Sequence, residues 1–146
     1  MLVEVYGLGI LILNDSKMEN NEIALELIHK NHCLVSCNVV NIYCEDENVI
    51  IGTRANNNID YCIYIHGLGI INMSHLFENN VIMKKEIQLV VKLEENNSER
   101  ALAGHAFNKK YIELGGIKIP FLCIIIESEQ DIPSLIESIA LSERSE

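Results

Sequence analysis

Short apolar blocks separated by polar turns run along most of the chain, and this pattern predicts a domain made largely of β-strands. Leu2–Val5 and Ile10–Leu13 are two such blocks, and the segment between them contains two glycines that suit a tight turn. We therefore predict a β-hairpin at the start of the chain. Its second strand is apolar at every position, as expected for a strand buried on both faces of a sheet.

A helix is predicted soon after this hairpin, at Glu22–Lys30. Its apolar residues recur at helical spacing and are Ile23, Ala24, Leu27 and Ile28. Asn20 or Asn21 is a suitable N-cap, and Asn31 can take the left-handed conformation that ends a helix. The chain therefore begins with a hairpin ending in a buried strand, then a polar loop and an amphipathic helix.

The remaining pattern predicts more strands and two further helices. The predicted strands are Cys33–Ser36, Val39–Cys44, Val49–Gly52, Tyr61–Ile65, Ile87–Leu93, Tyr111–Leu114 and Ile117–Ile126. We predict a short helix at Ile70–Phe77 and a longer one at Ile132–Leu141, for which Asp131 is the N-cap. The polar stretches 56–58 and 96–108 are predicted loops.

Composition and charge narrow the range of functions. The chain has 146 residues, is 49% hydrophobic, and carries a formal net charge of −10 from 21 acidic and 11 basic residues. No repeat or linker-like segment divides it, so residues 1–146 are predicted to form a single domain. Nucleic acids and anionic membranes require clustered Lys and Arg, so neither is an expected partner. The longest apolar run, Phe121–Ile126, is shorter than the ~20 residues of a membrane helix, and no signal peptide is recognisable. We therefore expect a cytoplasmic protein.

Five cysteines are present, and none forms a Cys-x-x-Cys pair. Reduced and mostly buried thiols are the expected state. Structural zinc sites use paired ligands at short spacing. His32, Cys33 and Cys37 match that pattern only in part, so they are a weak indication of a zinc site.

The strand–loop–helix unit at residues 3–32 has the architecture that presents a phosphate-binding loop at the N-terminus of a helix. Its apolar parts are complete. The loop itself, Asn14–Asn21, has no glycine, and its one lysine, Lys17, lies in the middle. Phosphate-binding loops need glycines for close backbone approach and a lysine at the helix start. The chain therefore has the frame of such a loop without its chemistry.

Five separated segments resemble the catalytic C-terminal domain of the bifunctional HPr(Ser) kinase/phosphorylase. In chain order they are VEVYGLGILIL, NEIALELIHKNHCLV, IHGLGIINMSHLF, IQLVVKLEE and GIKIPFLCIII followed by LIESIA. The resemblance covers nearly the whole chain. It implies that family's α/β fold, a P-loop-containing fold like that of phosphoenolpyruvate carboxykinase, with mixed β-sheets and few helices.

The resemblance also implies an activity and an assembly. Members of the family use ATP or pyrophosphate with Mg²⁺ to phosphorylate a serine of HPr, a sugar-transport phosphocarrier, and remove that phosphate by phosphorolysis. They assemble as hexamers. A homo-oligomer, with HPr or a related kinase subunit as partner, is therefore the expectation that the resemblance supplies. Compared with the family, the chain is expected to be truncated at both ends.

The departures from the family lie in the residues that carry the chemistry. The family loop reads like GDSGVGKS, whereas this chain has Asn14, Asp15, Ser16, Lys17, Met18, Glu19, Asn20 and Asn21. Asn14, Lys17 and Glu19 replace the three glycines. Asn20 replaces the phosphate-binding lysine, and Asn21 replaces the serine that binds magnesium.

The catalytic base and the signature segment are also changed. Where the family reads GHRLVADD, with the first aspartate as general base, this chain has NHCLVSCN, so Cys37 stands at the aspartate. A thiol with a pKa near ~8.5 is no substitute for a carboxylate at neutral pH. The family signature EIRGLGIINV places Tyr64 at the magnesium-binding glutamate and His66 at the arginine. Its Gly67, Leu68 and Gly69 are unchanged.

Two further family positions have lost their arginine or basic loop. The arginine of a family stretch like LFGAGAVR aligns with Met83. The Gly-Arg-Asn used in dephosphorylation corresponds to Glu129–Asp131, so Gln130 stands at the arginine. A loop that favours phosphate has become acidic, which repels phosphate and a phosphoprotein.

Three functional hypotheses follow. The first is a folded pseudoenzyme, acting as a regulatory or interaction module in phosphocarrier and carbohydrate regulation, with no cofactor bound. The second is a weakly active serine kinase/phosphorylase that uses Lys17, Asp15 and His66. The third is a module that binds another small molecule or a metal in the vacated pocket. We also predict that the Asp15 or Glu19 carboxylate faces the amides that begin the Glu22 helix, where a phosphate would otherwise lie.

Overall fold

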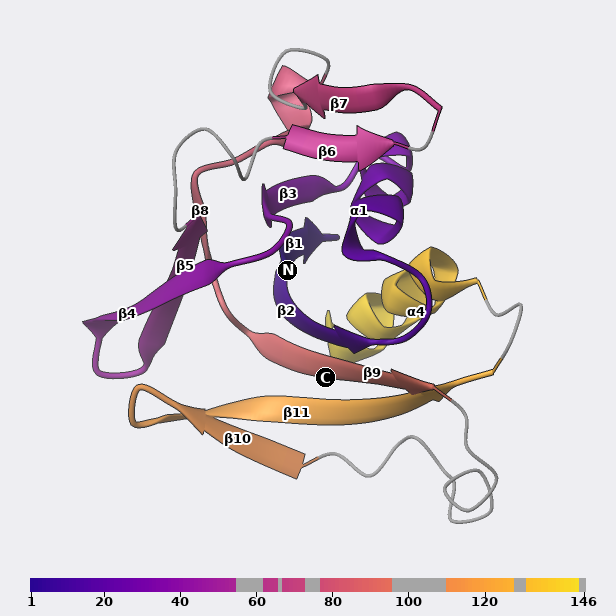
Figure 1. Cartoon of the computed structure of the whole chain (residues 1–146). Coiled ribbons are helices and arrows are strands. Elements are labelled where there is room, and N and C mark those ends of the chain that lie inside the picture. Colours follow the sequence, from indigo (N-terminus) through magenta and orange to yellow (C-terminus); the bar gives the residue numbers. More distant parts are fainter. Residues whose placement is uncertain (55–61, 66, 73–76, 96–109, 128–130, 145–146) are drawn as a thin grey trace.

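The computed structural model describes residues 1–54, 62–65, 67–72, 77–95, 110–127 and 131–144, shown as ribbon in Figure 1. Its helices are α1 (Asn20–His29) and α4 (Ile132–Arg144), with a short 3₁₀ turn at Glu78–Asn80. Its strands are β1 (Leu2–Val5), β2 (Leu8–Asp15), β3 (Cys33–Ser36), β4 (Val40–Asp46), β5 (Val49–Arg54), β6 (Cys62–Ile65), β7 (Gly69–Asn72), β8 (Lys84–Glu86), β9 (Leu89–Glu95), β10 (Lys110–Leu114) and β11 (Ile117–Ile126).

The main sheet has six strands in the order β10-β11-β9-β2-β1-β3. Its three central strands, β11, β9 and β2, run parallel, while β10 and β1 are antiparallel to their neighbours. A second sheet, β4-β5-β8, and a β6-β7 hairpin are separate. This is the mixed α/β architecture with few helices that the sequence predicts.

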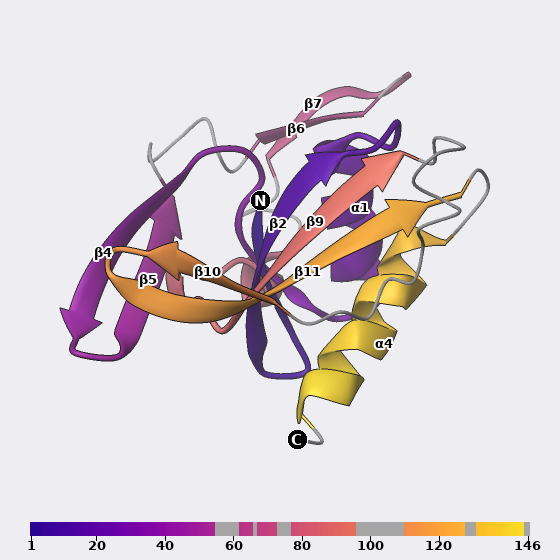
Figure 2. The same cartoon turned by 90° about the horizontal axis from the view of Figure 1, so that it is seen from below.

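The two faces of the main sheet bury different layers, as Figures 1 and 2 show. On one face, alternate strand residues such as Ile10, Ile12 and Val91 pack against α1 and α4. On the other face, the intervening residues, including Leu11 and Val90, pack against the second sheet. The strict alternation follows from the two-residue period of a strand. It explains why β2 and β9 are apolar at nearly every position.

The predicted β1–β2 hairpin is confirmed, with a turn of only two residues. Tyr6 and Gly7 both have positive φ, of 51° and 82°, as a tight hairpin turn requires. Gly9 is needed for a different reason. A Cβ atom at this position would lie 1.8 Å from the carbonyl oxygen of Glu86, so the chain segment before β9 approaches β2 closely only because residue 9 is glycine.

Helix α1 is confirmed, but it spans Asn20–His29 instead of the predicted Glu22–Lys30. Glu19 precedes its first residue as N-cap and makes no side-chain capping bond, so neither Asn20 nor Asn21 is the N-cap. At the other end, Asn31 has φ of 69°, the predicted left-handed conformation. The adjacent N–H of His32 donates to the carbonyl of Leu27, which closes the end of the helix.

Other predictions have mixed outcomes. The short helix predicted at Ile70–Phe77 is wrong, because residues 69–72 form strand β7, opposite β6; residues 73–76 lie outside the described part. Asp131 caps α4 as predicted, since its carboxylate accepts from the backbone N–H of Ser134 at 3.1 Å. The predicted loops at 56–58 and 96–108 lie outside the described residues. No helix in the described part of the chain is long and apolar enough to cross a membrane.

Candidate functional site

The segment between β2 and α1 lies at the carboxyl edge of the parallel strands. Strand β9 ends beside it with Glu95. Strand β3, which runs parallel to β2, ends near it with Ser36, and Cys37 follows. In doubly wound α/β folds this edge is where ligands bind. The fold therefore places the loop between β2 and α1 where α/β domains bind ligands.

The side chain of Asn14 occupies the inside of the loop. Its Nδ2 donates to the carbonyl of Met18 at 2.7 Å and to Oδ1 of Asn20 at 2.9 Å. Its Oδ1 accepts from the N–H and the Oγ of Ser16, at 3.0 and 2.6 Å. One asparagine thus satisfies polar groups on both sides of the loop, where a glycine would leave an open cradle.

The two asparagines that begin α1 are held by neighbouring segments. Asn20 Nδ2 donates to the carbonyl of Cys37 at 3.0 Å. Asn21 Oδ1 accepts from the thiol of Cys37 at 3.3 Å, and its Nδ2 donates to the carbonyl of Tyr64 at 3.4 Å. These bonds connect α1 to the end of β3 and to β6. Cys37 is fully buried, as predicted, but it lies in a bend directly after β3 and not in a strand.

The prediction that Asp15 or Glu19 caps the start of α1 is wrong. Glu19 makes no side-chain capping bond, and the Asp15 carboxylate faces Lys92, with Oδ2 3.9 Å from Nζ. A carboxylate does bond a loop amide, but it comes from another strand. Glu95 Oε1, at the end of β9, accepts from the backbone N–H of Lys17. Sequence reasoning missed Glu95 because 78 residues separate the two partners.

A hollow of about 350 Å³ opens beside the loop. It is lined by Asn14, Ser16, Met18, Glu19, Asn20, Asn21 and Asn38. A second hollow of about 460 Å³ shares Glu19 and Asn21 and extends to Tyr64 and Leu25. Among the described residues, amides, a hydroxyl, a carboxylate and the Met18 thioether line the first hollow, and no Lys or Arg does. The lining therefore offers a polyphosphate no cation.

The other positions that the resemblance assigns to the site do not complete a phosphate site within the described part of the chain. Met83 is 75% exposed and lines neither hollow, and Tyr64 is 56% exposed. Gly67 and Gly69 have φ of 90° and 89°, so the unchanged glycines shape the turn beside β7, in which Leu68 is exposed. His66 and Gln130 lie outside the described residues.

The residues at the metal positions do not fit Mg²⁺ bound to a nucleotide. Asn21 offers only an amide oxygen, which already accepts from the Cys37 thiol, and Tyr64 offers an exposed phenol. Mg²⁺ in phosphoryl-transfer sites is held by carboxylates and hydroxyls together with substrate phosphates. Within the described ranges, no group of three His, Cys, Asp or Glu residues could hold a metal ion.

The three residues that hinted at zinc have other roles in the structure. His32 bonds Glu137, and Cys37 bonds Asn21. Burial and the nearby Glu4 carboxylate raise the pKa of the Cys33 thiol, which keeps it protonated at neutral pH.

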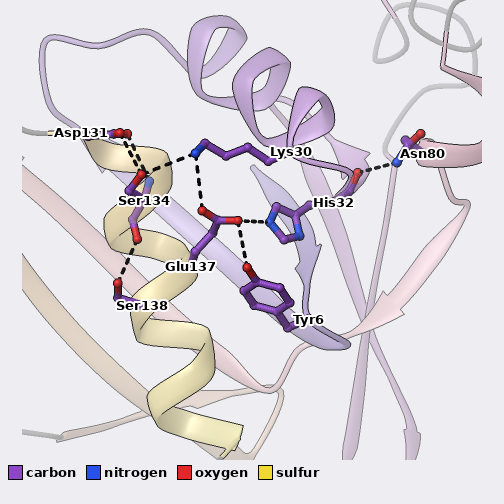
Figure 3. Close-up of polar contacts among 8 residues, drawn as sticks. All are labelled: Tyr6, Lys30, His32, Asn80, Asp131, Ser134, Glu137 and Ser138. Atoms are coloured by element: carbon purple, nitrogen blue, oxygen red, sulfur yellow. Dashed lines mark hydrogen bonds and ion pairs between the residues drawn. The ribbon is translucent and has the colours of Figure 1, made fainter.

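A second polar cluster, shown in Figure 3, joins α4 to the α1–β3 junction. Glu137 Oε2 lies 2.6 Å from His32 Nε2 and accepts from the Tyr6 hydroxyl at 3.1 Å, while Lys30 Nζ lies 3.6 Å from its Oε1. The hydrogen bond from His32 lowers the pKa of Glu137, and the same carboxylate raises the pKa of Tyr6. The sequence carried no signal for this cluster, because its members are separated by up to 131 residues.

A parallel strand, a loop at its carboxyl end and a helix on a mixed sheet define an α/β domain with the strand–loop–helix unit in which P-loop proteins place their loop. The family model described as HPr Serine kinase C-terminal domain matches residues 1–146. The chain belongs to this HPr kinase C-terminal family.

Similar proteins agree with this assignment. The chain is 39% identical over 145 residues to the HPr kinase/phosphorylase of Treponema pallidum (strain Nichols), covering 99% of this chain and 46% of that protein. It is 32% identical to the HPr kinase/phosphorylase of Chlorobium phaeobacteroides, covering 97% of this chain and 44% of that protein. The chain thus spans about half the length of these relatives.

A solved structure shares the fold. The Hpr(Ser) kinase/phosphatase from Coxiella burnetii superposes with a TM-score of 0.79 at 25% identity, covering 98% of this chain and 87% of that one. The expected fold class is confirmed.

Proposed function

We propose that this domain does not transfer phosphoryl groups and acts as a regulatory or interaction module in HPr-dependent phosphocarrier regulation. The observation that carries the proposal is the position of Asn20. Its amide donates to the Cys37 carbonyl and its oxygen accepts from Asn14. The residue at the family's phosphate-binding lysine position is thereby part of an internal hydrogen-bond network that closes the loop.

Electrostatics near the loop supports the same proposal. Phosphoryl transfer depends on positioning and on neutralising the charge of the phosphates. Asp15, Glu19 and Glu95 are carboxylates in or against the loop. The nearby Lys92 pairs with Glu94 at 3.1 Å, so its charge is already compensated. Three carboxylates in or against the loop outnumber its one lysine, Lys17, so a polyphosphate brought to the loop meets net repulsion.

HPr or an HPr kinase subunit is the proposed partner. The relatives at 39% and 32% identity are named HPr kinase/phosphorylase, and the matching model is that of an HPr serine kinase domain. Because the domain has the fold of these relatives, we propose that it keeps a surface for the same partners. We further propose a homo-oligomeric, cytoplasmic protein, as in the family. Affinity capture with purified HPr and with an active HPr kinase tests the partner, and light scattering tests the assembly.

Nucleotide titration by calorimetry tests the loss of activity. We expect no heat of binding for ATP with Mg²⁺, or for pyrophosphate with Mg²⁺, at millimolar concentration. The matched comparison is the double variant Glu19→Gly with Asn20→Lys, which returns one glycine and the lysine of the family loop. Measurable binding by that variant alone supports the proposal. Transfer of labelled phosphate from ATP to HPr by the unaltered chain would overturn it.

A weakly active kinase is the second candidate, because Lys17 is exposed and forms no ion pair within the described part of the chain. In that reading Lys17 takes over the role of the lost lysine, with Asp15 and His66 as further ligands. Lys17→Ala would then abolish any residual phosphate transfer. A third reading, another small molecule in the hollow, predicts binding that is unaffected by Lys17→Ala.

A further inference from the structure

Glu95 lies against the loop because of how β2 and β9 pair. The two strands run side by side in the same direction, visible in Figure 2, and Asp15 is paired with Glu94 at their ends. The next residue of β9, Glu95, therefore extends past the end of β2. Its carboxylate accepts a hydrogen bond from the backbone N–H of Lys17, in the middle of the loop.

The other carboxylates around the loop make no such contact in the described structure. Glu94 Oε1 lies 3.1 Å from Lys92 Nζ, and Asp15 faces the same amine from 3.9 Å. Glu19 has no side-chain capping bond. Glu95 is thus the carboxylate, among the described residues, that bonds the backbone of the loop between β2 and α1. It contributes a negative charge at an amide of the type that cradles phosphate in loops of this class.

We propose that Glu95 is an internal anion that autoinhibits this loop, holding the Lys17 amide so that no external anion can bind there. The inference rests on the proposed function, since both treat the loop as an anion cradle that the chain itself closes. The further inference is that one of the groups closing the loop, the Glu95 carboxylate, can move away from it. Asn14 and Asn20 belong to the loop and its helix, whereas Glu95 belongs to a neighbouring strand and can leave without breaking the Asn14 bonds.

Two effects make the contact inhibitory. A carboxylate–amide bond is charge-assisted and therefore stronger than a neutral hydrogen bond, so an incoming anion must displace a good acceptor. The same carboxylate repels an anion that approaches to bonding distance. Removing the carboxylate eliminates both effects at once. Removing Glu94 eliminates long-range repulsion and the pair with Lys92, but leaves the Lys17 amide bonded to Glu95.

Binding of inorganic pyrophosphate in magnesium-free, low-salt buffer tests this proposal by calorimetry. Glu95→Ala vacates the Lys17 amide, and Glu95→Gln leaves a neutral acceptor. The control is Glu94→Gln, which removes the same charge one residue earlier in β9. We expect Glu95→Ala to bind pyrophosphate at least about tenfold more tightly than the detection limit that the unaltered chain does not reach. We expect weaker binding by Glu95→Gln and a change of less than about twofold for Glu94→Gln. Circular dichroism melts confirm that each variant is folded.

The outcomes separate cleanly. Equal affinity of folded Glu95→Ala and the unaltered chain overturns the proposal, and so does the absence of binding by every variant. An equal gain for Glu94→Gln also overturns it, because that gain would be a general charge effect. The proposed function is judged separately by phosphate transfer to HPr. If the unaltered chain transfers phosphate to HPr and Glu95→Ala still binds pyrophosphate more tightly, the proposed function is overturned and the inference about Glu95 stands.

Discussion

The Nε2 atom of His32 lies 2.6 Å from the Oε2 atom of Glu137, across 105 residues of chain. His32 is buried at the junction of α1 and β3, and Glu137 projects from α4 toward it (Figure 3). The His32 carbonyl also accepts from Asn80 Nδ2 at 3.0 Å. One residue therefore fixes the C-terminal helix, the start of β3 and the 3₁₀ turn together. Strand β3 ends at Ser36, next to Cys37 and the candidate site.

Replacing Glu137 by glutamine is expected to destabilise the domain. The change removes the charged partner of a buried imidazole, which typically costs about 1–2 kcal/mol. Urea denaturation measures the difference. The control is Glu26→Gln, at an exposed position of the other helix, which should change the free energy of unfolding by less than about 0.5 kcal/mol. Equal effects of both variants would show that the His32 contact contributes nothing beyond surface charge.

The same pair gives stability a defined pH dependence at the acid end. The hydrogen bond from His32, with help from Tyr6 and Lys30, lowers the pKa of Glu137 below its ordinary value of 4.5. A lowered pKa contributes stability that is complete above that ordinary value and is lost as the pH falls through the lowered one. Between pH 6 and pH 3, the free energy of unfolding should fall more steeply for the unaltered chain than for Glu137→Gln. The difference in slope should be on the order of a few tenths of a kcal/mol per pH unit. Parallel curves would contradict this assignment.

Tyr6 makes the stability of the domain depend on pH at the alkaline end as well. Its hydrogen bond to Glu137 raises its pKa above the ordinary value of 10.0, since ionisation would place a phenolate beside a carboxylate. The stability that the Tyr6–Glu137 hydrogen bond contributes is complete below the ordinary pKa of tyrosine and is lost as the pH rises through the raised value. Spectrophotometric titration at 295 nm should therefore show one late-titrating tyrosine that is absent from Tyr6→Phe. A titration of the tyrosines that is unchanged in Tyr6→Phe, apart from amplitude, would contradict it.

Asn14 is expected to stabilise the loop through its side chain. Asn14→Ala removes the bonds to Met18, Asn20 and Ser16, at an expected cost of about 1–2 kcal/mol. Hydrogen exchange should show faster exchange of the Ser16 amide, whose acceptor is lost. Asn38→Ala is the matched control, because Asn38 lines the same hollow without a side-chain hydrogen bond in the described structure. A similar effect of both changes would mean that the Asn14 bonds do not hold the loop.

Gly9 is expected to tolerate no side chain. In Gly9→Ala the new Cβ would lie 1.8 Å from the Glu86 carbonyl oxygen, so β2 and the segment before β9 must separate. We expect a loss of at least about 2 kcal/mol in thermal or urea unfolding. Gly7→Asn is the control, because a Cβ there meets nothing within 4 Å and asparagine accepts positive φ. A mild effect of Gly9→Ala would show that the backbone can shift at this point.

Several elements were predictable because their signals are local. Strands β1, β3 and β11 begin and end at the predicted residues, and the predicted left-handed Asn31 follows the end of α1 at His29. Apolar periodicity and turn residues determine such elements without reference to distant segments. Strand β8 was not predicted, because its Lys84–Glu86 stretch is polar and becomes a strand only by pairing with β5. The failed helix at 70–77 has the same origin, since pairing with β6 decides the state of an ambiguous apolar run.

The candidate site was likewise predictable only where its features depend on local sequence. The sequence alone determined that the loop after β2 lacks the glycines and the lysine of a phosphate cradle, because those requirements concern residue types at fixed spacing. Only the tertiary structure decided what replaces the phosphate. We had expected a local carboxylate, Asp15 or Glu19, whereas the contact comes from Glu95, and Asn14 fills the interior. The pairing of β2 with β9 and the packing of α4 against α1 bring together groups far apart in the chain, and no local pattern records such contacts.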